Sequence, residues 1–227
     1  MGILEQWKDY RTKSRHRSYE KLGDTLKNLV TTKEQRLEAI EALADADDMS
    51  LAAPQLMKRF DLVVEHGIID KREKERVFEV LVSHPDISRP LVCDAVKSSK
   101  RISWPIKLAE KLLSDEDYQS LLLSSLNTES VLFEETVHER NIEILLALKE
   151  KLTEKAVEPA KILVRSRDEQ VRMAALECLE AQANQFELAR QCLRELLAEP
   201  LTDDNSRFMG LVKAIVSKHN WGASGPK

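Results

Sequence analysis

The stretch VEPAKILVRSRDEQVRMAALECLE, residues 157–180, decides the fold class of this chain. It predicts two short amphipathic helices, over residues 154–165 and 169–182, joined by a tight polar turn. In the second helix the apolar residues Ala175, Leu176 and Leu179 share one face at helical spacing. A helix pair this short cannot bury its apolar face alone, so the pattern predicts that further helix pairs stack against it.

An earlier part of the chain repeats this pattern. Residues 35–43, QRLEAIEAL, align without gaps with residues 171–179, VRMAALECL. The matching positions are Arg36 with Arg172, Ala39 with Ala175, and Leu43 with Leu179. A small alanine lets two helices approach closely, and the larger apolar residues fill the space between layers. The alignment therefore indicates divergent copies of one helical unit.

The unit resembles a HEAT repeat, most clearly over residues 158–183. The resemblance implies an all-α fold, a HEAT-like α-solenoid of stacked antiparallel helix pairs with about five to six irregular repeats. Ser166 stands where HEAT repeats commonly place Asp in the turn, and Asp168 is the expected N-cap. We divide the chain into basic and aromatic capping helices at 1–30, a repeat array at 31–219 and a flexible tail at 220–227.

Local signals place the helix boundaries. Thr32 and Gln35 have capping-box spacing, and His84-Pro85 is typical of a break between helices. We expect other helices to start at or near Pro54, Asp70, Ser88, Ser103, Ser114, Thr128 and Asn141. Gly67 is expected to end a helix whose last turn holds His66.

Composition supports a helical chain and restricts its partners. Charged residues make up 33% and aromatic residues only 5%, with six glycines, which favours helices over strands. The net charge of −4 argues against a general polyanion binder. Residues 1–30 nevertheless carry a balance of +3, which leaves −7 for the remainder.

Cysteine usage and hydropathy indicate the compartment. The three cysteines have no CxxC spacing and lie in apolar helical patterns, which is typical of buried thiols in a reducing cytosol. No apolar run approaches the roughly 20 residues of a membrane span. The first residues lack the features of a signal peptide, and Gln6 stands where a myristoylation signal has Ser or Thr. We expect a cytoplasmic protein.

Motifs for catalysis are missing from the sequence. The glycines are scattered singly, and the histidines and cysteines form no cluster with metal-ligand or nucleophile spacing. The acidic runs at 115–117 and 134–135 are interpreted as charges at helix starts or facing solvent. We expect no catalytic residue, no cofactor and no metal.

The segment between Trp7 and Tyr19 is the best candidate for partner contact. Lys8, Arg11 and Arg15 share a helical face, and Trp7 and Tyr10 supply flat apolar surface. Such a pattern suits phosphate contact with base stacking, an anionic membrane surface, or a solvated capping helix. With a second basic–aromatic cluster around residue 101, the candidate partner-binding residues are Lys8, Arg11, Arg15, Arg17, Arg101, Trp104 and Arg172.

Three functional hypotheses follow. The first is a non-enzymatic scaffold or adaptor that binds a protein or peptide partner along its helical surface. The alternative is a nucleic-acid-binding HEAT-like protein and, remotely, a DNA-glycosylase-like enzyme, although no residue matches that family's catalytic position. A third is a regulatory or lyase-like HEAT protein that handles a cofactor or another enzyme's active site. The sequence favours the first.

The first prediction concerns residues 8–17, which we expect to be helical and to pack on the first repeat through Leu4, Trp7 and Tyr10. Trp7→Ala should then lower the free energy of unfolding by roughly 2–4 kcal/mol. Charge reversal of Arg11 and Arg15 to Glu should change it by less than about 0.5 kcal/mol and slow association with an acidic partner. Thermal melts and binding kinetics measure both effects. An unchanged melt for Trp7→Ala with lost partner binding would make Trp7 an exposed contact residue instead.

Overall fold

The structure is a computed structural model that describes residues 3–129, 135–199 and 206–221, with side chains from residue 13 onward. Within these ranges the chain forms twelve α-helices, two short 3-10 helices and no strand. The all-α fold is thereby confirmed for the described residues. The solenoid arrangement stays a prediction, as do the domain boundaries. Residues 222–227 of the tail expected at 220–227, and most of the helix expected after Thr128, lie outside the described residues.

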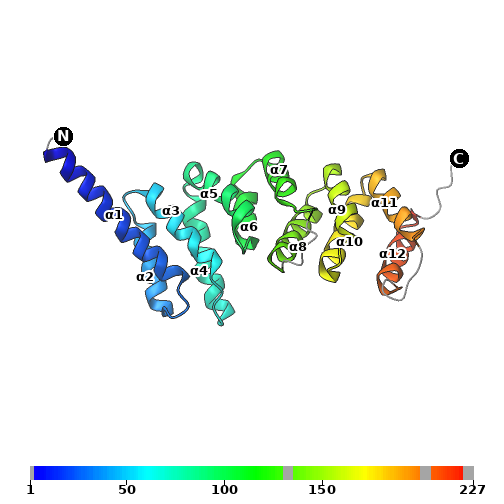
Figure 1. The fold of residues 1–227 in the computed structure, drawn as a ribbon, viewed down its shortest axis with the longest axis horizontal. Helices are drawn as coiled ribbons and strands as arrows, with labels where there is room; N and C mark the ends of the chain where they lie inside the picture. Colours follow the sequence, from blue (N-terminus) through cyan, green and yellow to red (C-terminus); the bar gives the residue numbers. More distant parts are fainter. Residues whose placement is uncertain (1–2, 130–134, 200–205, 222–227) are drawn as a thin grey trace. The chain divides into compact units, whose positions relative to one another are not determined.

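The chain folds into two compact units, Met1–Tyr118 and Gln119–Lys227. The boundary falls inside helix α7, Asp115–Ser125. Figure 1 traces both units along the sequence. Each unit has a buried apolar core of its own, built mainly from leucine, valine, isoleucine and alanine.

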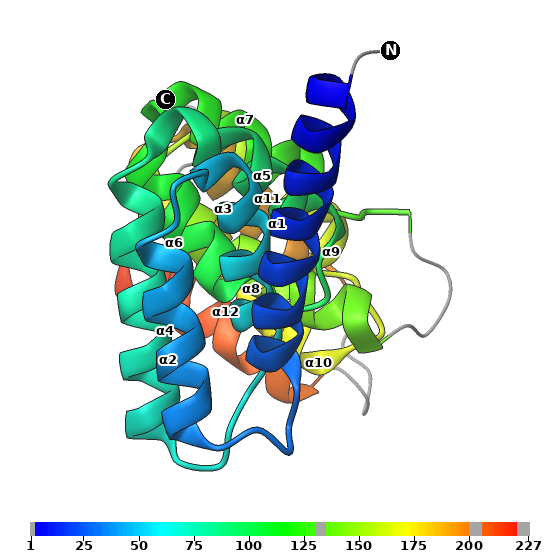
Figure 2. The same ribbon diagram turned by 90° about the vertical axis from the view of Figure 1, so that its left-hand side faces the viewer.

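In the first unit, helix α1 packs against α2, α3 and the following 3-10 helix, as Figure 2 shows. Helix α4 contacts α2 and α6, and α5 contacts α3 and α6. The elements are α1 (Ile3–Lys27), α2 (Lys33–Ala44), α3 (Met49–Met57), η1 (Lys58–Asp61), α4 (Gly67–Val82), α5 (Pro85–Ser98) and α6 (Ser103–Leu112).

In the second unit, helix α10 is central, because it contacts α8, α9 and α11. The elements are α8 (Glu135–Glu150), η2 (Glu154–Ala156), α9 (Val157–Leu163), α10 (Glu169–Ala183), α11 (Glu187–Leu197) and α12 (Ser206–Lys218). Gln182 of α10 is fully buried and forms hydrogen bonds at the end of α8. Its amide donates to the carbonyls of Leu148 and Lys151 and accepts from the backbone N–H of Thr153. The helix pair predicted at 154–182 is confirmed.

Several predicted helix starts are also confirmed. Thr32 caps α2 in a reciprocal capping box with Gln35, and the two hydrogen bonds measure 3.1 and 3.3 Å. Asp168 caps α10, since its carboxylate accepts from the backbone N–H of Val171 at 2.9 Å. Ser103 begins α6, and Pro85 begins α5 after the predicted break. At Thr32 and Asp168, a short polar side chain therefore caps the helix start.

The prediction around Gly67 was wrong. Gly67 begins α4 and His66 is its N-cap residue, because the His66 carbonyl accepts from the N–H groups of Ile69 and Asp70. A glycine that ends a helix needs a positive φ, and the φ of Gly67 is not positive. Asp70 and Glu73 therefore lie inside α4, where they bind basic side chains instead of capping a helix.

Three further predicted starts lie within helices. Asp48 caps α3 through the N–H of Ser50, which places Pro54 inside that helix. Ser88 is buried in α5 and donates to the Leu81 carbonyl at 2.7 Å. Asn141 is buried in α8, where its amide exchanges two hydrogen bonds with the backbone of Asn127. Polar residues that resemble caps in sequence here satisfy backbone groups of a neighbouring segment.

A close approach between α1 and α3 depends on Gly23. A Cβ at this position would lie 2.3 Å from Oε1 and 2.9 Å from Cβ of Gln55. Gln55 Oε1 is buried and has no hydrogen-bond partner among the described residues. The missing side chain of Gly23 therefore makes room for the Gln55 amide.

Gly23→Ala should destabilise the fold. Overpacking costs about 1–3 kcal/mol, and a gain in helix propensity of about 1 kcal/mol offsets part of it. We expect a net loss of up to about 2 kcal/mol in urea unfolding. Gly210→Ala in α12 is the matched control, because a Cβ there meets nothing within 4 Å and should stabilise instead. Equal effects of the two substitutions would contradict the close approach.

Candidate functional site

An open hollow lies at one end of α2 and α4 in the first unit. It has a volume of about 670 Å³ and is bounded by the segment after α1, the start of α2 and the segment that leads into α4. The lining residues are Leu29, Thr31, Lys33, Glu34, Arg36, Val63, Val64, Glu65, His66 and Ile69. The hollow thus brings together two stretches of the chain that lie far apart in sequence.

Large apolar side chains gather around this hollow in exposed positions. Leu29 and Val63 line it with 75% and 49% of their surface exposed. Val30 and Ile68, next to lining residues in the sequence, are 89% and 77% exposed. Single exposed apolar residues are common, but a group with a polar rim marks interaction surfaces. Here Lys33, Glu34 and Glu65 supply the rim.

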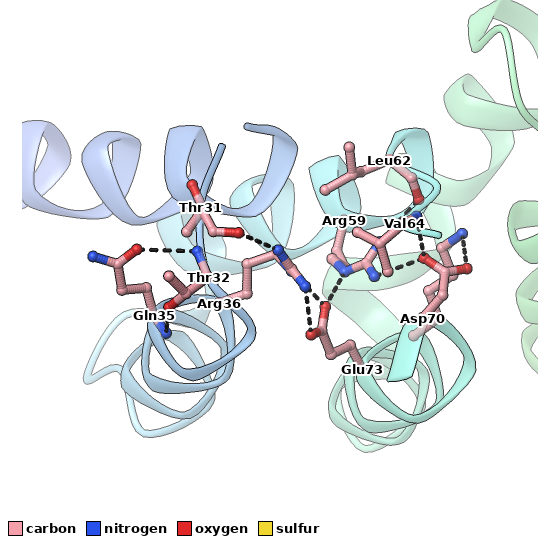
Figure 3. A network of polar contacts seen from close by, with 10 residues as sticks. Thr31, Thr32, Gln35, Arg36, Arg59, Leu62, Val64, Asp70 and Glu73 are labelled. Carbon is pink, nitrogen blue, oxygen red and sulfur yellow. Dashed lines mark hydrogen bonds and ion pairs between the residues drawn. The ribbon is translucent and has the colours of Figure 1, made fainter. Parts of the chain in front are cut away.

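A charge network, formed by Arg36, Arg59, Asp70, Glu73 and Lys74, adjoins the hollow through Arg36, which also lines it; Figure 3 shows the polar contacts of the network. Its centre is Glu73, whose carboxylate accepts two hydrogen bonds from Arg36, at 2.9 and 3.1 Å, and one from Arg59 at 2.8 Å. Arg59 is fully buried, and only 5% of Arg36 and 4% of Glu73 is exposed. One carboxylate therefore joins α2, η1 and α4.

The second carboxylate of the charge network is Asp70. It accepts from Arg59 at 2.7 Å, from Lys74 at 2.7 Å and from the backbone N–H of Val64 at 3.3 Å. Arg59 also donates to the Leu62 carbonyl at 2.9 Å. The extended segment that borders the hollow is thereby held at Leu62 and at Val64.

Burial and pairing set the charge states of the network. Burial acts to raise the pKa of Asp70, but the hydrogen bonds from Lys74 and Arg59 hold this pKa below its usual value. Burial lowers the pKa of Lys74, and the bond to Asp70 opposes only part of that effect. Three basic side chains share two carboxylates, so the network carries a formal excess of one positive charge.

Two predicted partner-binding residues lie beside this network. Trp104 stacks on Phe60 with ring centroids 5.7 Å apart, meets Phe78 edge-on at 6.2 Å, and lies under the Lys107 ammonium at 4.8 Å. Trp104 is therefore a packing residue between α6, η1 and α4. Arg101 is exposed and interacts electrostatically with Lys74. Neither lines the hollow.

The other predicted residues lie elsewhere. Arg172 belongs to the second unit, where it donates to the carbonyls of Ser166 and Arg167, both at 2.9 Å. Arg15 and Arg17 are exposed on α1, and Arg15 lies 4.0 Å from Asp47. Lys8 and Arg11 belong to the same helix, but their side chains lie outside the described residues. Within the first unit, Arg15 and Arg17 lie on α1, whereas Arg101 and Trp104 lie at the start of α6; a single site formed by all seven residues stays a prediction.

Sequence analysis missed both the hollow and the charge network. One signal was present: Asp70, Glu73 and Lys74 are spaced three and four apart and precede Val77 and Leu81 on the buried side of α4. Charged residues at core spacing indicate an internal ion network when partners exist. Those partners, Arg36 and Arg59, come from other elements, and no sequence spacing reveals them.

Metal-binding and membrane-spanning features are absent from the part of the chain that the structure describes. No group of three or more His, Cys, Asp or Glu there could hold a metal ion. Among the same residues, no helix is both long enough and apolar enough to cross a membrane.

Removal of the Glu73 carboxylate, which Arg36 and Arg59 share, should destabilise the fold. Glu73→Ala leaves Arg36 buried without a carboxylate and leaves Arg59 with Asp70 alone, so we expect a loss of about 3–5 kcal/mol in the free energy of unfolding. Glu41→Ala is the control, because Glu41 pairs with Arg76 by two hydrogen bonds on the surface. That exposed pair should contribute less than about 1 kcal/mol. Urea unfolding of both variants measures the difference, and similar losses would refute the special role of Glu73.

Comparison of the chain with protein-family models, with curated proteins and with solved structures found no match.

Proposed function

We propose that this chain is a non-enzymatic scaffold or adaptor that binds a protein or peptide partner at the hollow of its first unit. The observation that carries the proposal is the group of exposed apolar side chains around the hollow, Leu29, Val30, Val63 and Ile68. A partner that covers them removes apolar surface from water, which is the main driving force of protein association. The polar rim supplies hydrogen bonds that orient the partner.

The frame of the hollow supports this proposal. Arg36 donates to the Thr31 carbonyl on one side, and the Arg59–Asp70 pair holds Leu62 and Val64 on the other. Both bordering segments are therefore fixed by buried groups before any partner binds. A preformed surface loses less conformational entropy on binding, which favours affinity.

We also propose that both units are built from HEAT-like repeats. In α2 and α10, an N-cap residue is followed four positions later by an arginine, Arg36 or Arg172, that donates to a carbonyl of the preceding turn. The aligned alanines and leucines of the two helices are buried alike. Equivalent residues with equivalent contacts support a common repeat. The three free cysteines suit the cytoplasmic location that we propose with it.

The test compares two double variants in affinity capture followed by titration with the purified partner. Leu29→Asp with Val63→Asp places charges on the proposed surface, and we expect at least roughly tenfold weaker binding. Ile162→Asp with Leu188→Asp is the matched control, because these residues of the second unit are 47% and 43% exposed. The control should bind within about twofold of the unchanged protein.

Thermal melts of both variants show whether either change unfolds the protein. Equal loss of partner binding in the two variants would locate the interface elsewhere. Recovery of no protein partner, together with turnover of a small molecule, would overturn the proposed function as a whole.

A further inference from the structure

The first half of α1 stands apart from the rest of the first unit. Residues 13–18, nearly two helical turns, are exposed on every side of the helix. Among the residues from 13 onward, Tyr19 is the first that is partly buried, and Gly23 and Leu26 are buried. In Figures 1 and 2 the first turns of α1 extend beyond α2 and α3. Such a helix segment lacks tertiary packing, and isolated helices of this length are marginal in water.

The helical register places three apolar positions of this half, Ile3, Trp7 and Tyr10, away from the packed stripe, whereas the position of Leu4 lies on the same side as Leu22. The stripe against α2 and α3 consists of Tyr19, Leu22, Gly23 and Leu26. At about 100° per residue, the positions of Ile3, Trp7 and Tyr10 lie on average about two-fifths of a turn from the centre of the stripe. The register therefore places Ile3, Trp7 and Tyr10 at positions outside the stripe.

The charged positions of residues 3–18 are arranged around that apolar side. By the same register, one uncharged arc of the helix is formed by Ile3, Trp7, Tyr10, Ser14 and Ser18. Arg17 borders the arc on one edge, and Arg11 and Arg15 border it on the other. Glu5 and Asp9, the two acidic residues of the segment, fall on the opposite side.

We propose that residues 3–18 of α1 form an amphipathic element that lies flat on an anionic membrane surface. An interfacial helix inserts an apolar side that contains Trp and aliphatic residues, while Arg and Lys along its edges reach lipid phosphates. The arc, its arginine borders and the distant acidic positions meet this requirement together. A flat anionic surface touches both borders at once, and neither acidic position faces it.

The charge distribution of the whole chain supports the same orientation. Residues 1–30 carry +3 and the remainder carries −7. An anionic surface therefore attracts this helix and repels the rest of the chain. Each basic residue near such a surface contributes about fivefold to binding at low salt. The inference does not depend on the proposed partner at the hollow.

The experiment measures co-sedimentation of the full chain with large vesicles of phosphatidylcholine alone or with roughly 30 mol% phosphatidylserine, at roughly 0.1 M salt. We expect binding to the anionic vesicles and none to the neutral ones. Arg11→Glu with Arg15→Glu should weaken vesicle binding at least roughly tenfold. Lys111→Glu with Lys155→Glu changes the net charge equally at exposed positions of other helices, and should weaken it less than about twofold.

Trp7→Ala distinguishes membrane contact from packing of Trp7 inside the protein. On a membrane it should reduce vesicle binding at least roughly threefold and leave the thermal melt unchanged. A lowered melt would show that Trp7 packs inside the protein, as the sequence predicted, and would overturn the proposal. Failure to bind anionic vesicles would overturn it as well. Tighter, strongly salt-dependent binding to duplex DNA that displaces the vesicles would assign the segment to nucleic acid instead.

Discussion

The carboxylate of Glu73 is the interaction on which the first unit depends. It is buried between two guanidinium groups, one from α2 and one from η1, and it belongs to α4. Buried ion pairs stabilise a fold only when their geometry and pairing are complete. The network therefore forms only when α2, η1 and α4 meet in one arrangement. Apolar residues could fill the same space, but forked hydrogen bonds also fix the register of α2 against α4.

Arg36 and Arg59 also hold two surface segments in place. Each uses its remaining N–H groups on backbone carbonyls of the segments around the hollow, at Thr31 and at Leu62. These segments carry the exposed apolar residues that we propose for partner binding. Loops with few regular hydrogen bonds are normally the most mobile parts of a fold. Here buried charges hold two of them, so an apolar surface can persist without a partner.

The fold class was predictable from sequence, and the charge network was not. Helix starts at Thr32 and Asp168 rest on local spacing, which sequence displays directly. The predictions for Gly67 and Asn141 were wrong because the surroundings of these residues decide their roles. Gly67 lacks the positive φ of a glycine that ends a helix. Asn141 forms hydrogen bonds with the backbone of Asn127 instead of capping a helix. The network joins residues from three elements across long sequence separations. The core spacing of the charged positions of α4 indicates an internal network, but without knowledge of which helices face each other the sequence does not reveal Arg36 and Arg59 as the partners.

The chain uses its basic residues in two distinct ways. The arginines of the charge network are buried and paired, so little of their field reaches solvent, whereas Arg15 and Arg17 on α1 remain exposed. A helix of this length spans roughly 37 Å, so its first turns and the hollow beyond its other end are separated by more than the Debye length of about 8–10 Å. Charges on the first turns therefore act on approach to a surface without altering the field at the hollow. A membrane contact at one end of α1 thus leaves the other end free for a partner.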